Sequence, residues 1–299
     1  MCGIVGLFLK NQKLRPELGS LLGTMLTTLS ERGPDSAGFA VYGEARPDRI
    51  KLTLRAGADT DFDAIAAEIG SQLGEDVSIC RRDTHAVLSV PAARAAEVRA
   101  ELGRIAPDIT IVGMGRRMEL YKEVGLPGEV AKRFALAGMV GTHAIGHTRM
   151  ATESAVTTDG AHPYSTGADQ CLVHNGSLSN HNALRRELQR DGIGFATEND
   201  TEVAAGYLTW RLRQGMHLGA ALENALEDLD GFYTFVVGTE SGFGVLRDPI
   251  ACKPAVMAEA GDYVAFGTEY RALADLPGIE HARVFEPEPA KVYFWDLRQ

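Results

Sequence analysis

Apolar residues along the chain recur at two spacings, one typical of strands and one typical of helices. Ile4-Val5-Gly6-Leu7-Phe8 is a short apolar run that predicts a buried strand. Between Pro16 and Ser30 the apolar side chains follow one face of a helix: Leu18, Leu21, Leu22, Met25, Leu26 and Leu29. Gly33-Pro34 ends that helix in a turn, and Phe39-Ala40-Val41-Tyr42 predicts the next strand.

The segment from residue 46 to residue 116 has a pattern of its own. Strands are predicted at 49–55, 77–82, 84–90 and 108–114, and helices at 62–73 and 91–102. The order β-α-β-β-α-β is the split βαβ arrangement of ferredoxin-like domains, so we expect an inserted ferredoxin-like subdomain. Three roles are open for it: small-molecule sensing, partner docking, or a structural insertion without a ligand.

The remaining chain groups its strands and helices instead of alternating them. Strands are predicted at 119–124, 142–152 (running into a polar loop), 171–174, 232–237, 243–247, 255–258, 264–267 and 291–295, and helices at 129–137, 182–190, 201–214, 218–229 and 270–273. This grouping favours an α+β architecture in which helices cover sheets.

Composition and charge exclude several classes of function. The chain has 299 residues, of which 45% are hydrophobic and 23% are charged, as in an ordinary globular protein. The net charge of −10 provides no basic surface for nucleic acid or an anionic membrane. No apolar run approaches the ~20 residues of a membrane span, and the first residues do not resemble a signal peptide.

Cysteine and histidine spacing argues against a metal centre in this chain. Cys2, Cys80, Cys171 and Cys252 are scattered without a C-x-x-C pair, which fits a reducing cytoplasm. His143 and His147 are four residues apart, but the glycines and β-branched residues around them favour a strand, where this spacing does not pair ligands.

The first residues bring the most reactive chemistry. If Met1 is removed, Cys2 carries both a thiol and a free α-amine. A thiolate is a strong nucleophile, and an α-amine with a pKa near ~8 can act as its general base. The alternative is that Cys2 is only a small residue before a buried strand.

Several short motifs accompany Cys2 in a fixed order. They are Met1-Cys2-Gly3-Ile4-Val5-Gly6, residues 32–38 (RGPDSAG), residues 146–152 (GHTRMAT), His174-Asn175-Gly176 and residues 198–202 (ENDTE). Together they resemble the class II glutamine amidotransferases, a branch of the N-terminal-nucleophile hydrolases. Ala161-His162-Pro163 and residues 247–254 (RDPIACKP) also resemble that family.

The resemblance implies a fold and an active site. The fold is a four-layer αββα sandwich formed by residues 2–45 and 117–299, with residues 46–116 inserted. Cys2 attacks the side-chain amide of glutamine, and its own amine moves the proton. The Asn175 side chain and the Gly176 N–H stabilise the oxyanion.

The same resemblance assigns the substrate contacts. Arg149 binds the α-carboxylate of glutamine, together with Thr152 and the backbone at Glu153, and Asp200 pairs with the α-ammonium. Arg32 and Asp35 hold the turn beside the pocket. His147 and His174 are expected to be structural, because the nucleophile carries its own base.

Plain structural interpretations are also available from the residues alone. Asn175-Gly176 is a common type I′ hairpin turn, Arg149 could be a surface arginine, and Asp200 could cap the helix before Thr201. The sequence also departs from the family's amino-sugar enzymes, because Met150 and Glu153 replace a tryptophan and a histidine.

The released ammonia needs an acceptor site. No loop for ATP pyrophosphate chemistry or phosphoribosyl diphosphate is present, so we expect the synthase on another polypeptide. The nearest resemblance is to the glutaminase-like subunit of N-methylglutamate synthase, whose partner subunits would hold flavin mononucleotide and iron–sulfur clusters. This chain would hold no cofactor or metal. The alternatives are a free-standing amidase and a non-catalytic subunit that keeps the fold.

Overall fold

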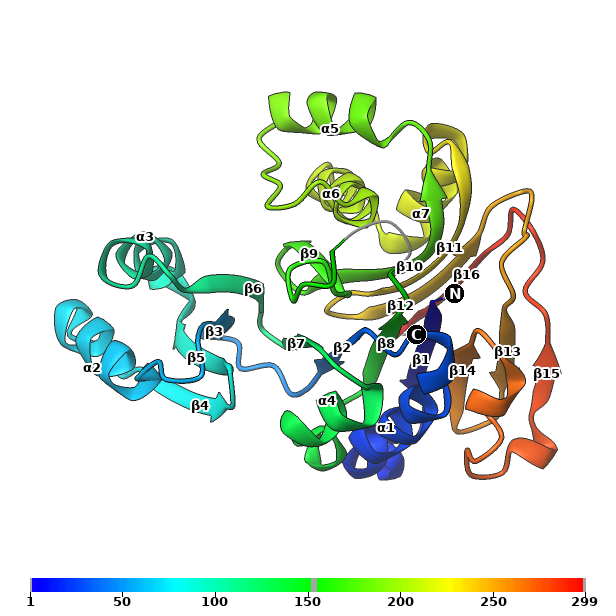
Figure 1. Ribbon diagram of the computed structural model, residues 1–299, viewed down its shortest axis with the longest axis horizontal. Coiled ribbons are helices and arrows are strands. Elements are labelled where there is room, and N and C mark those ends of the chain that lie inside the picture. The colour runs from blue at the N-terminus through cyan, green and yellow to red at the C-terminus, as the bar shows by residue number, and fades with distance from the viewer. Residues whose placement is uncertain (1, 152–154, 298–299) are drawn as a thin grey trace.

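The computed structural model describes residues 2–151 and 155–297, and its strands form three antiparallel sheets (Figure 1). The first sheet has the order β15 (Arg283–Phe285), β13 (Val256–Glu259), β14 (Tyr263–Gly267), β1 (Gly3–Leu9), β8 (His143–Arg149), β2 (Ser36–Tyr42) and β7 (Met118–Val124). The second has the order β16 (Val292–Asp296), β12 (Gly242–Arg247), β11 (Gly231–Gly238), β10 (Gln170–Leu178) and β9 (Tyr164–Gly167).

Helices cover the outer faces of these two sheets. The seven-stranded sheet packs against α1 (Leu18–Thr28) and α4 (Pro127–Arg133), and the five-stranded sheet packs against α5 (His181–Arg190), α6 (Asp200–Arg213) and α7 (Leu218–Asp228). A third apolar cluster fills the space between the sheets. The layers are therefore helix, sheet, sheet and helix, which is an α+β architecture.

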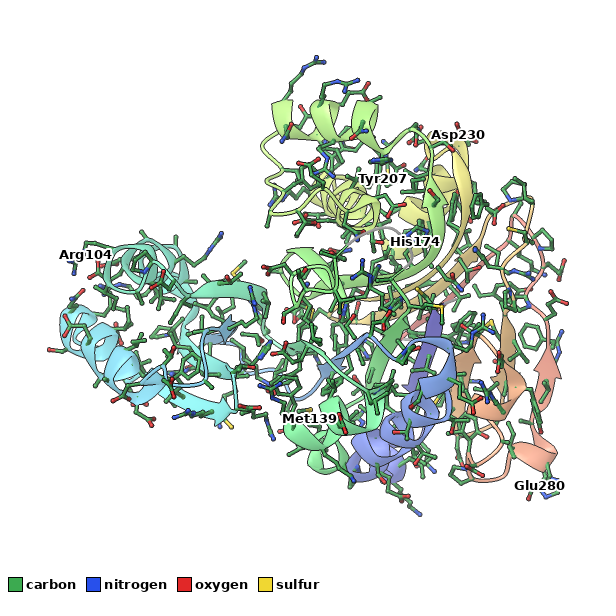
Figure 2. All side chains as sticks on the ribbon, viewed as in Figure 1. Arg104, Met139, His174, Tyr207, Asp230 and Glu280 are labelled. Atoms are coloured by element: carbon green, nitrogen blue, oxygen red, sulfur yellow. The ribbon has the colours of Figure 1, made fainter. Side chains whose placement is uncertain are left out.

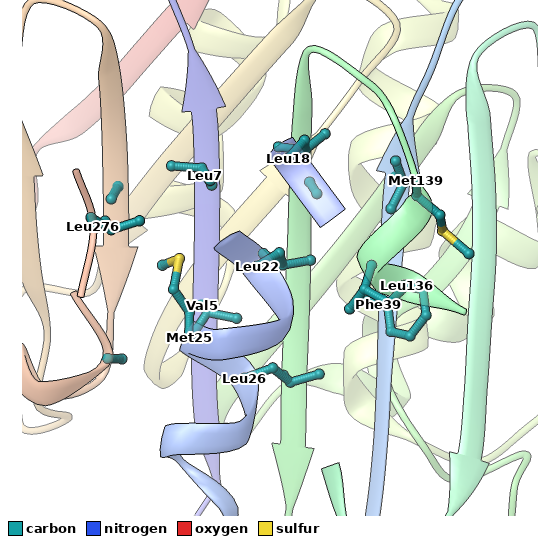
Figure 3. Packing of buried hydrophobic residues seen from close by; sticks show 14 of the residues in the cluster. Val5, Leu7, Leu18, Leu22, Met25, Leu26, Phe39, Leu136, Met139 and Leu276 are labelled. Atoms are coloured by element: carbon teal, nitrogen blue, oxygen red, sulfur yellow. The ribbon is translucent and has the colours of Figure 1, made fainter. Parts of the chain in front are cut away.

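The apolar run of β1 follows from its place in the middle of these layers. Successive side chains of a strand point to opposite faces. Val5 and Leu7 belong to the cluster that faces α1 (Figure 3), whereas Ile4 and Phe8 belong to the cluster between the sheets. Because both faces are buried, every position of β1 is apolar or glycine.

Residues 49–115 form a separate four-stranded sheet with two helices, which projects to the left in Figure 1. The elements are β3 (Arg49–Arg55), α2 (Phe62–Leu73), β4 (Ser78–Arg82), β5 (His85–Pro91), α3 (Ala95–Ile105) and β6 (Thr110–Gly115), and the strand order is β4-β5-β3-β6. Leu52, Phe62, Ile69, Leu88 and Val98 are in its own core. The predicted element order of this segment is confirmed.

Three strand predictions need correction. The sequence predicted no strand at β9 or β15, which are short and lie at sheet edges. The strand predicted at 171–174 continues to Leu178, with Asn175 and Gly176 paired to Thr234 and Tyr233 of β11. The interpretation of Asn175-Gly176 as a hairpin turn is therefore wrong. Cross-strand pairing outweighed the local turn preference of the dipeptide.

In the part of the chain that the structure describes, no helix is both long and apolar enough to cross a membrane. Across residues 2–151 and 155–297, no group of three or more histidine, cysteine, aspartate or glutamate side chains is placed to hold a metal ion. His143 lies on β8, as the glycine-rich context predicted.

Candidate active site

The candidate site lies where β1, β8 and β10 converge between the two sheets. Cys2 directly precedes β1 and is partly exposed. Its carbonyl oxygen accepts a hydrogen bond from Arg32 Nε at 3.2 Å and one from Asn175 Nδ2 at 3.3 Å. Its Sγ lies 4.0 Å from the Met150 carbonyl oxygen. Cys2 is thus held from two sides.

Strand alternation explains why Asn175 and Arg149 face the same space. On β10, Cys171 and Val173 point into the cluster between the sheets, and Asn175 continues that face. On β8, Ile145 points into the same cluster, and Arg149 lies four positions further on that face. Both side chains are buried, so the interpretation of Arg149 as a surface residue is wrong.

Arg149 lies beside Cys2 because of the strand register. Gly3 pairs with Thr148 across β1 and β8, which places Cys2 next to Arg149. The guanidinium Nη1 donates to the Ala155 carbonyl oxygen at 3.4 Å. Thr152 and Glu153, the other predicted carboxylate contacts, lie outside the described residues.

The turn at Gly33-Pro34-Asp35 supports the chain on both sides of Arg149. The Asp35 N–H donates to the Arg149 carbonyl oxygen at 3.1 Å, and the Asp35 Oδ2 accepts from the Ala151 N–H at 2.8 Å. A Cβ at Gly33 would come within 2.3 Å of the Thr148 carbonyl carbon, so only glycine fits there. Arg32 also pairs with Glu269. These contacts agree with a positioning role for Arg32 and Asp35.

Gly176 adopts a conformation that other residues rarely adopt, with φ of 144°. Tyr233, its cross-strand neighbour, is bonded on the other side to Asp248: the Tyr233 N–H donates to Asp248 Oδ1 at 3.0 Å and the Asp248 N–H donates to the Tyr233 carbonyl at 3.0 Å. Gly176 and Tyr233 are therefore a non-hydrogen-bonded pair, and the Gly176 N–H faces away from β11. The neighbour of β10 on the other side is β9, which pairs with β10 only at Gln170 and Leu172. The N–H of Gly176 therefore lies beyond the part of β10 that β9 covers.

Asp200 is the first residue of α6 and lies beside β10. Its Oδ2 accepts from the Leu178 N–H at 2.9 Å, and its Oδ1 lies 3.7 Å from His174 Nδ1. Burial alone would raise the pKa of Asp200, but the His174 imidazole and the Leu178 N–H lower it to about 2. The helix is capped by Asn199, whose side chain accepts from the Thr201 N–H at 2.8 Å, so the interpretation of Asp200 as the cap is wrong.

Three buried imidazoles lie behind this site, around Thr201. The Thr201 Oγ1 is 2.8 Å from His162 Nε2 and 3.0 Å from His174 Nδ1 (His174 is labelled in Figure 2). His147 stacks on His162 at 4.0 Å and bonds through Nε2 to the His174 carbonyl oxygen at 3.2 Å. Burial lowers the pKa of His147 to about 3, so that this imidazole is neutral at pH 7. Among the described hydrogen bonds none joins these imidazoles to Cys2, which agrees with a structural role.

Sequence reasoning missed two buried residues that support the site. Thr201 belongs to the motif at residues 198–202 but was given no role of its own, yet its hydroxyl connects two imidazoles with α6. Lys122 of β7 donates from Nζ to the carbonyl oxygens of Ala161 at 2.8 Å and Asp159 at 3.1 Å. Burial lowers the pKa of Lys122 to about 8. The motif gives no indication of which groups the Thr201 hydroxyl contacts, and a lone lysine such as Lys122 carries no signal of such a role.

Comparison with known proteins agrees with this geometry. Residues 147–275 match the family described as the glutamine amidotransferase domain. The chain is 62% identical over 297 residues to the glutamine amidotransferase-like protein GlxB of Rhizobium meliloti (strain 1021). The alignment covers 99% of this chain and 98% of that protein. This chain belongs to the class II glutamine amidotransferases.

A second relative supports the same assignment. A protein of Methanothermobacter thermautotrophicus (strain Delta H) whose name also places it among the glutamine amidotransferases is 32% identical over 98% of this chain and 99% of its own length. The glutamine phosphoribosylpyrophosphate amidotransferase of B. subtilis is similar in structure, with a TM-score of 0.62 and 22% identity. That similarity covers 99% of this amidotransferase and 47% of the other chain, and it shows a shared fold.

Proposed function

We propose that this amidotransferase hydrolyses the side-chain amide of glutamine and supplies ammonia to a synthase on a separate polypeptide. The observation that carries the proposal is the convergence at Cys2. The thiol-bearing residue is held through its carbonyl by Arg32 and Asn175, and strand pairing places it beside the buried Arg149. An ionised carboxylate, Asp200, lies next to the strand that carries Asn175 and Gly176.

The proposed reaction starts at the Cys2 thiol. The α-amine of Cys2, once Met1 has been removed, accepts the thiol proton through a water, and Sγ attacks the amide carbon. The Asn175 amide has a second N–H besides the one that it donates to Cys2, and this N–H and that of Gly176 would stabilise the oxyanion. The C–N bond then breaks, the amine returns the proton to the leaving nitrogen, and ammonia departs. Water hydrolyses the thioester to glutamate.

Charge complementarity supports glutamine as the substrate. A guanidinium binds a carboxylate with two parallel hydrogen bonds, which suits Arg149 to the α-carboxylate. The low pKa of Asp200 keeps it ionised at neutral pH, which suits it to the α-ammonium. Thr152 and Glu153 are proposed to complete the carboxylate contact.

Substitution of the nucleophile tests the proposal. Cys2→Ala is expected to abolish glutamate release from glutamine and to leave the synthase reaction with free ammonia unchanged. Cys80→Ala removes an exposed thiol of β4 and is the matched control, expected to keep full activity. Normal glutamine use by Cys2→Ala would refute the assignment.

A narrower proposal concerns the synthase. The alignment with this chain covers 98% of the GlxB protein, so the two are of similar length. The structural alignment covers 47% of the phosphoribosylpyrophosphate amidotransferase chain, which is therefore about twice as long. We propose a glutamate-synthase-type complex such as N-methylglutamate synthase, with flavin mononucleotide and iron–sulfur clusters on partner subunits. Co-purification with flavin-containing chains tests this; a fully active monomer would instead favour a free-standing amidase.

The inserted segment also has a proposed identity. We infer that residues 46–116 are a ferredoxin-like subdomain within an amidotransferase domain formed by residues 2–45 and 117–299. Its strand order β4-β5-β3-β6 and its separate core support this division. The four-layer αββα sandwich of N-terminal-nucleophile hydrolases is supported by the two helix-covered sheets and the apolar cluster between them.

A further inference from the structure

A groove of about 680 Å³ separates the inserted segment from the five-stranded sheet and α6. One side is formed by β6 and by Arg99 of α3, and the other by β9 and the last residues of α6. Both β6 and β9 are edge strands of their sheets. Figure 1 shows β6 on the side of the inserted segment that is turned toward β9 and α6.

The two edge strands meet at one end of the groove. Met114 and Ala168 form a parallel bridge there, and the Asp169 N–H donates to the Met114 carbonyl oxygen at 2.7 Å. The Asp169 carboxylate accepts from the backbone N–H groups of Arg116, Arg117 and Met118 at 2.6, 2.8 and 2.9 Å. The two sides of the groove are therefore firmly connected at this end.

Gln170 lies on the floor of the groove, with 2% of its surface exposed. Its Oε1 accepts from the Thr209 hydroxyl at 3.0 Å, and Thr209 is in turn bonded to Thr166 at 2.8 Å. Within the described residues its Nε2 has no hydrogen-bond partner. A buried amide group without a partner costs about 1–3 kcal/mol, which a ligand with an acceptor oxygen would recover.

The charges of the groove have one sign. Arg99 and Arg213 are its charged lining residues, and both are exposed. Within residues 2–151 and 155–297 neither guanidinium takes part in an ion pair or a hydrogen bond. This contrasts with the net charge of −10 of the whole molecule. Two cations and an unused amide N–H group are suited to an anion.

We propose that this groove binds a small anion that carries a carboxylate or phosphate group. Arg99 and Arg213 bind the anion from the two sides, and the Gln170 amide, whose Nε2 is covered in this structure, donates to it from the floor after a local shift of the side chain. The effect on catalysis, which rests on the proposed glutaminase function, is that occupancy of the groove changes glutamine turnover at Cys2.

Two elements connect the groove with the candidate active site. β10 begins at Gln170 and reaches Asn175 five residues later, a distance of about 16 Å. α6 begins at Asp200 and ends at Arg213, a distance of about 20 Å. Each element thus has one end in the groove and, further along, carries a residue proposed to bind glutamine or the oxyanion. Residues 170–175 of β10 and 201–209 of α6 are buried, which makes these two elements the proposed route by which the sites are coupled.

The binding test uses the full chain with inorganic phosphate and glutarate as probes, each titrated by isothermal calorimetry. The double variant Arg99→Gln/Arg213→Gln is expected to weaken binding at least ~10-fold, because each arginine contributes a charge-assisted hydrogen bond. Gln170→Glu keeps an acceptor for Thr209 but puts an oxygen in place of the NH2 group, and is expected to abolish binding. Arg104→Gln is the matched control, because Arg104 is also on α3 but pairs with Glu101.

The outcomes separate this inference from the proposed glutaminase function. Binding that the groove variants weaken and Arg104→Gln does not supports the site, and the preference between phosphate and glutarate identifies the anionic group. No saturable binding of either probe overturns the proposal, as does binding that responds to Arg149→Gln instead. In glutaminase assays, a saturating probe is expected to change kcat/KM of the wild type but not of the double variant. Failure of the glutaminase assay leaves the calorimetric test intact.

Discussion

At the scale of single residues, neighbouring positions of β10 serve opposite faces. Asn175 points between the sheets to the Cys2 carbonyl oxygen, whereas His174 points to Thr201 on α6. Gly176 then departs from ordinary strand geometry, and a Cβ there would come within 1.9 Å of the Phe232 carbonyl oxygen. The alternation of the strand therefore separates the catalytic proposal for Asn175 from the structural role of His174.

Asn175→Ala tests the oxyanion proposal. The substitution removes a hydrogen-bond donor whose contribution is largest in the transition state, so kcat is expected to fall ~10²–10³-fold while KM for glutamine changes little. Steady-state glutamate release measures this. Asn182→Ala, at an exposed position of α5, is the control and should keep wild-type kcat. An unchanged kcat for Asn175→Ala would remove this residue from the oxyanion site.

At the scale of elements, α6 connects the site with the interior. Its residues from Thr201 to Thr209 are buried, and its first turn presents Asp200 and Thr201 to β10. The Glu202 carboxylate accepts from the backbone N–H groups of Ala196 at 2.8 Å and Thr197 at 2.7 Å, which fixes the loop before the helix. The position of Asp200 is therefore set by several independent contacts.

Thr201→Val tests the importance of this network for stability. The substitution keeps the shape of the side chain but leaves His162 Nε2 and His174 Nδ1 without their partner. Each unsatisfied buried group costs about 1–3 kcal/mol, so the free energy of unfolding in urea is expected to fall by roughly 2–4 kcal/mol. Thr201→Ser, which keeps the hydroxyl, should lose less than about half of that. Equal losses for the two variants would contradict the network.

Most helices and strands could be predicted from the apolar pattern, because burial of one or both faces of an element determines the spacing of its apolar residues. The helix predicted over 201–214 and the strand predicted over 4–8 agree closely with α6 and β1. The motifs also led to Asn175 and Arg149, which the structure brings to Cys2. The roles of Thr201 and Lys122 and the strand β9 could not be predicted in this way, because they depend on contacts between elements distant in sequence.

At the scale of the whole molecule, several histidines are buried in the neutral form. Burial lowers the pKa of His85, His143 and His147 to about 3, and burial with neighbouring imidazoles and cations lowers the pKa of His162 well below its ordinary value. In the unfolded chain these groups titrate near 6.5. Between pH 6.5 and 3 the unfolded state therefore binds more protons than the folded state, and folding stability falls with falling pH.

Acid titration of stability tests this account of the buried histidines. Each group contributes up to about 1.4 kcal/mol per pH unit, so the four together can give a slope of about 5 kcal/mol per pH unit well below pH 6.5. Urea unfolding at pH 7, 6 and 5 is expected to show little change at first and then a steep loss. His281→Gln, at an exposed site, should not alter the profile. A flat profile between pH 6.5 and 5 would show that the imidazoles titrate normally.

The central claim is that Cys2 is the first residue of the active protein and the nucleophile toward glutamine. The most direct test is the intact mass of the protein before and after reaction with a glutamine analogue that alkylates thiols, followed by peptide mapping. The account predicts a mass without Met1 and a single label on Cys2 that excess glutamine prevents. Retention of Met1, or a label on Cys80 or Cys252 with Cys2 unmodified, would contradict it.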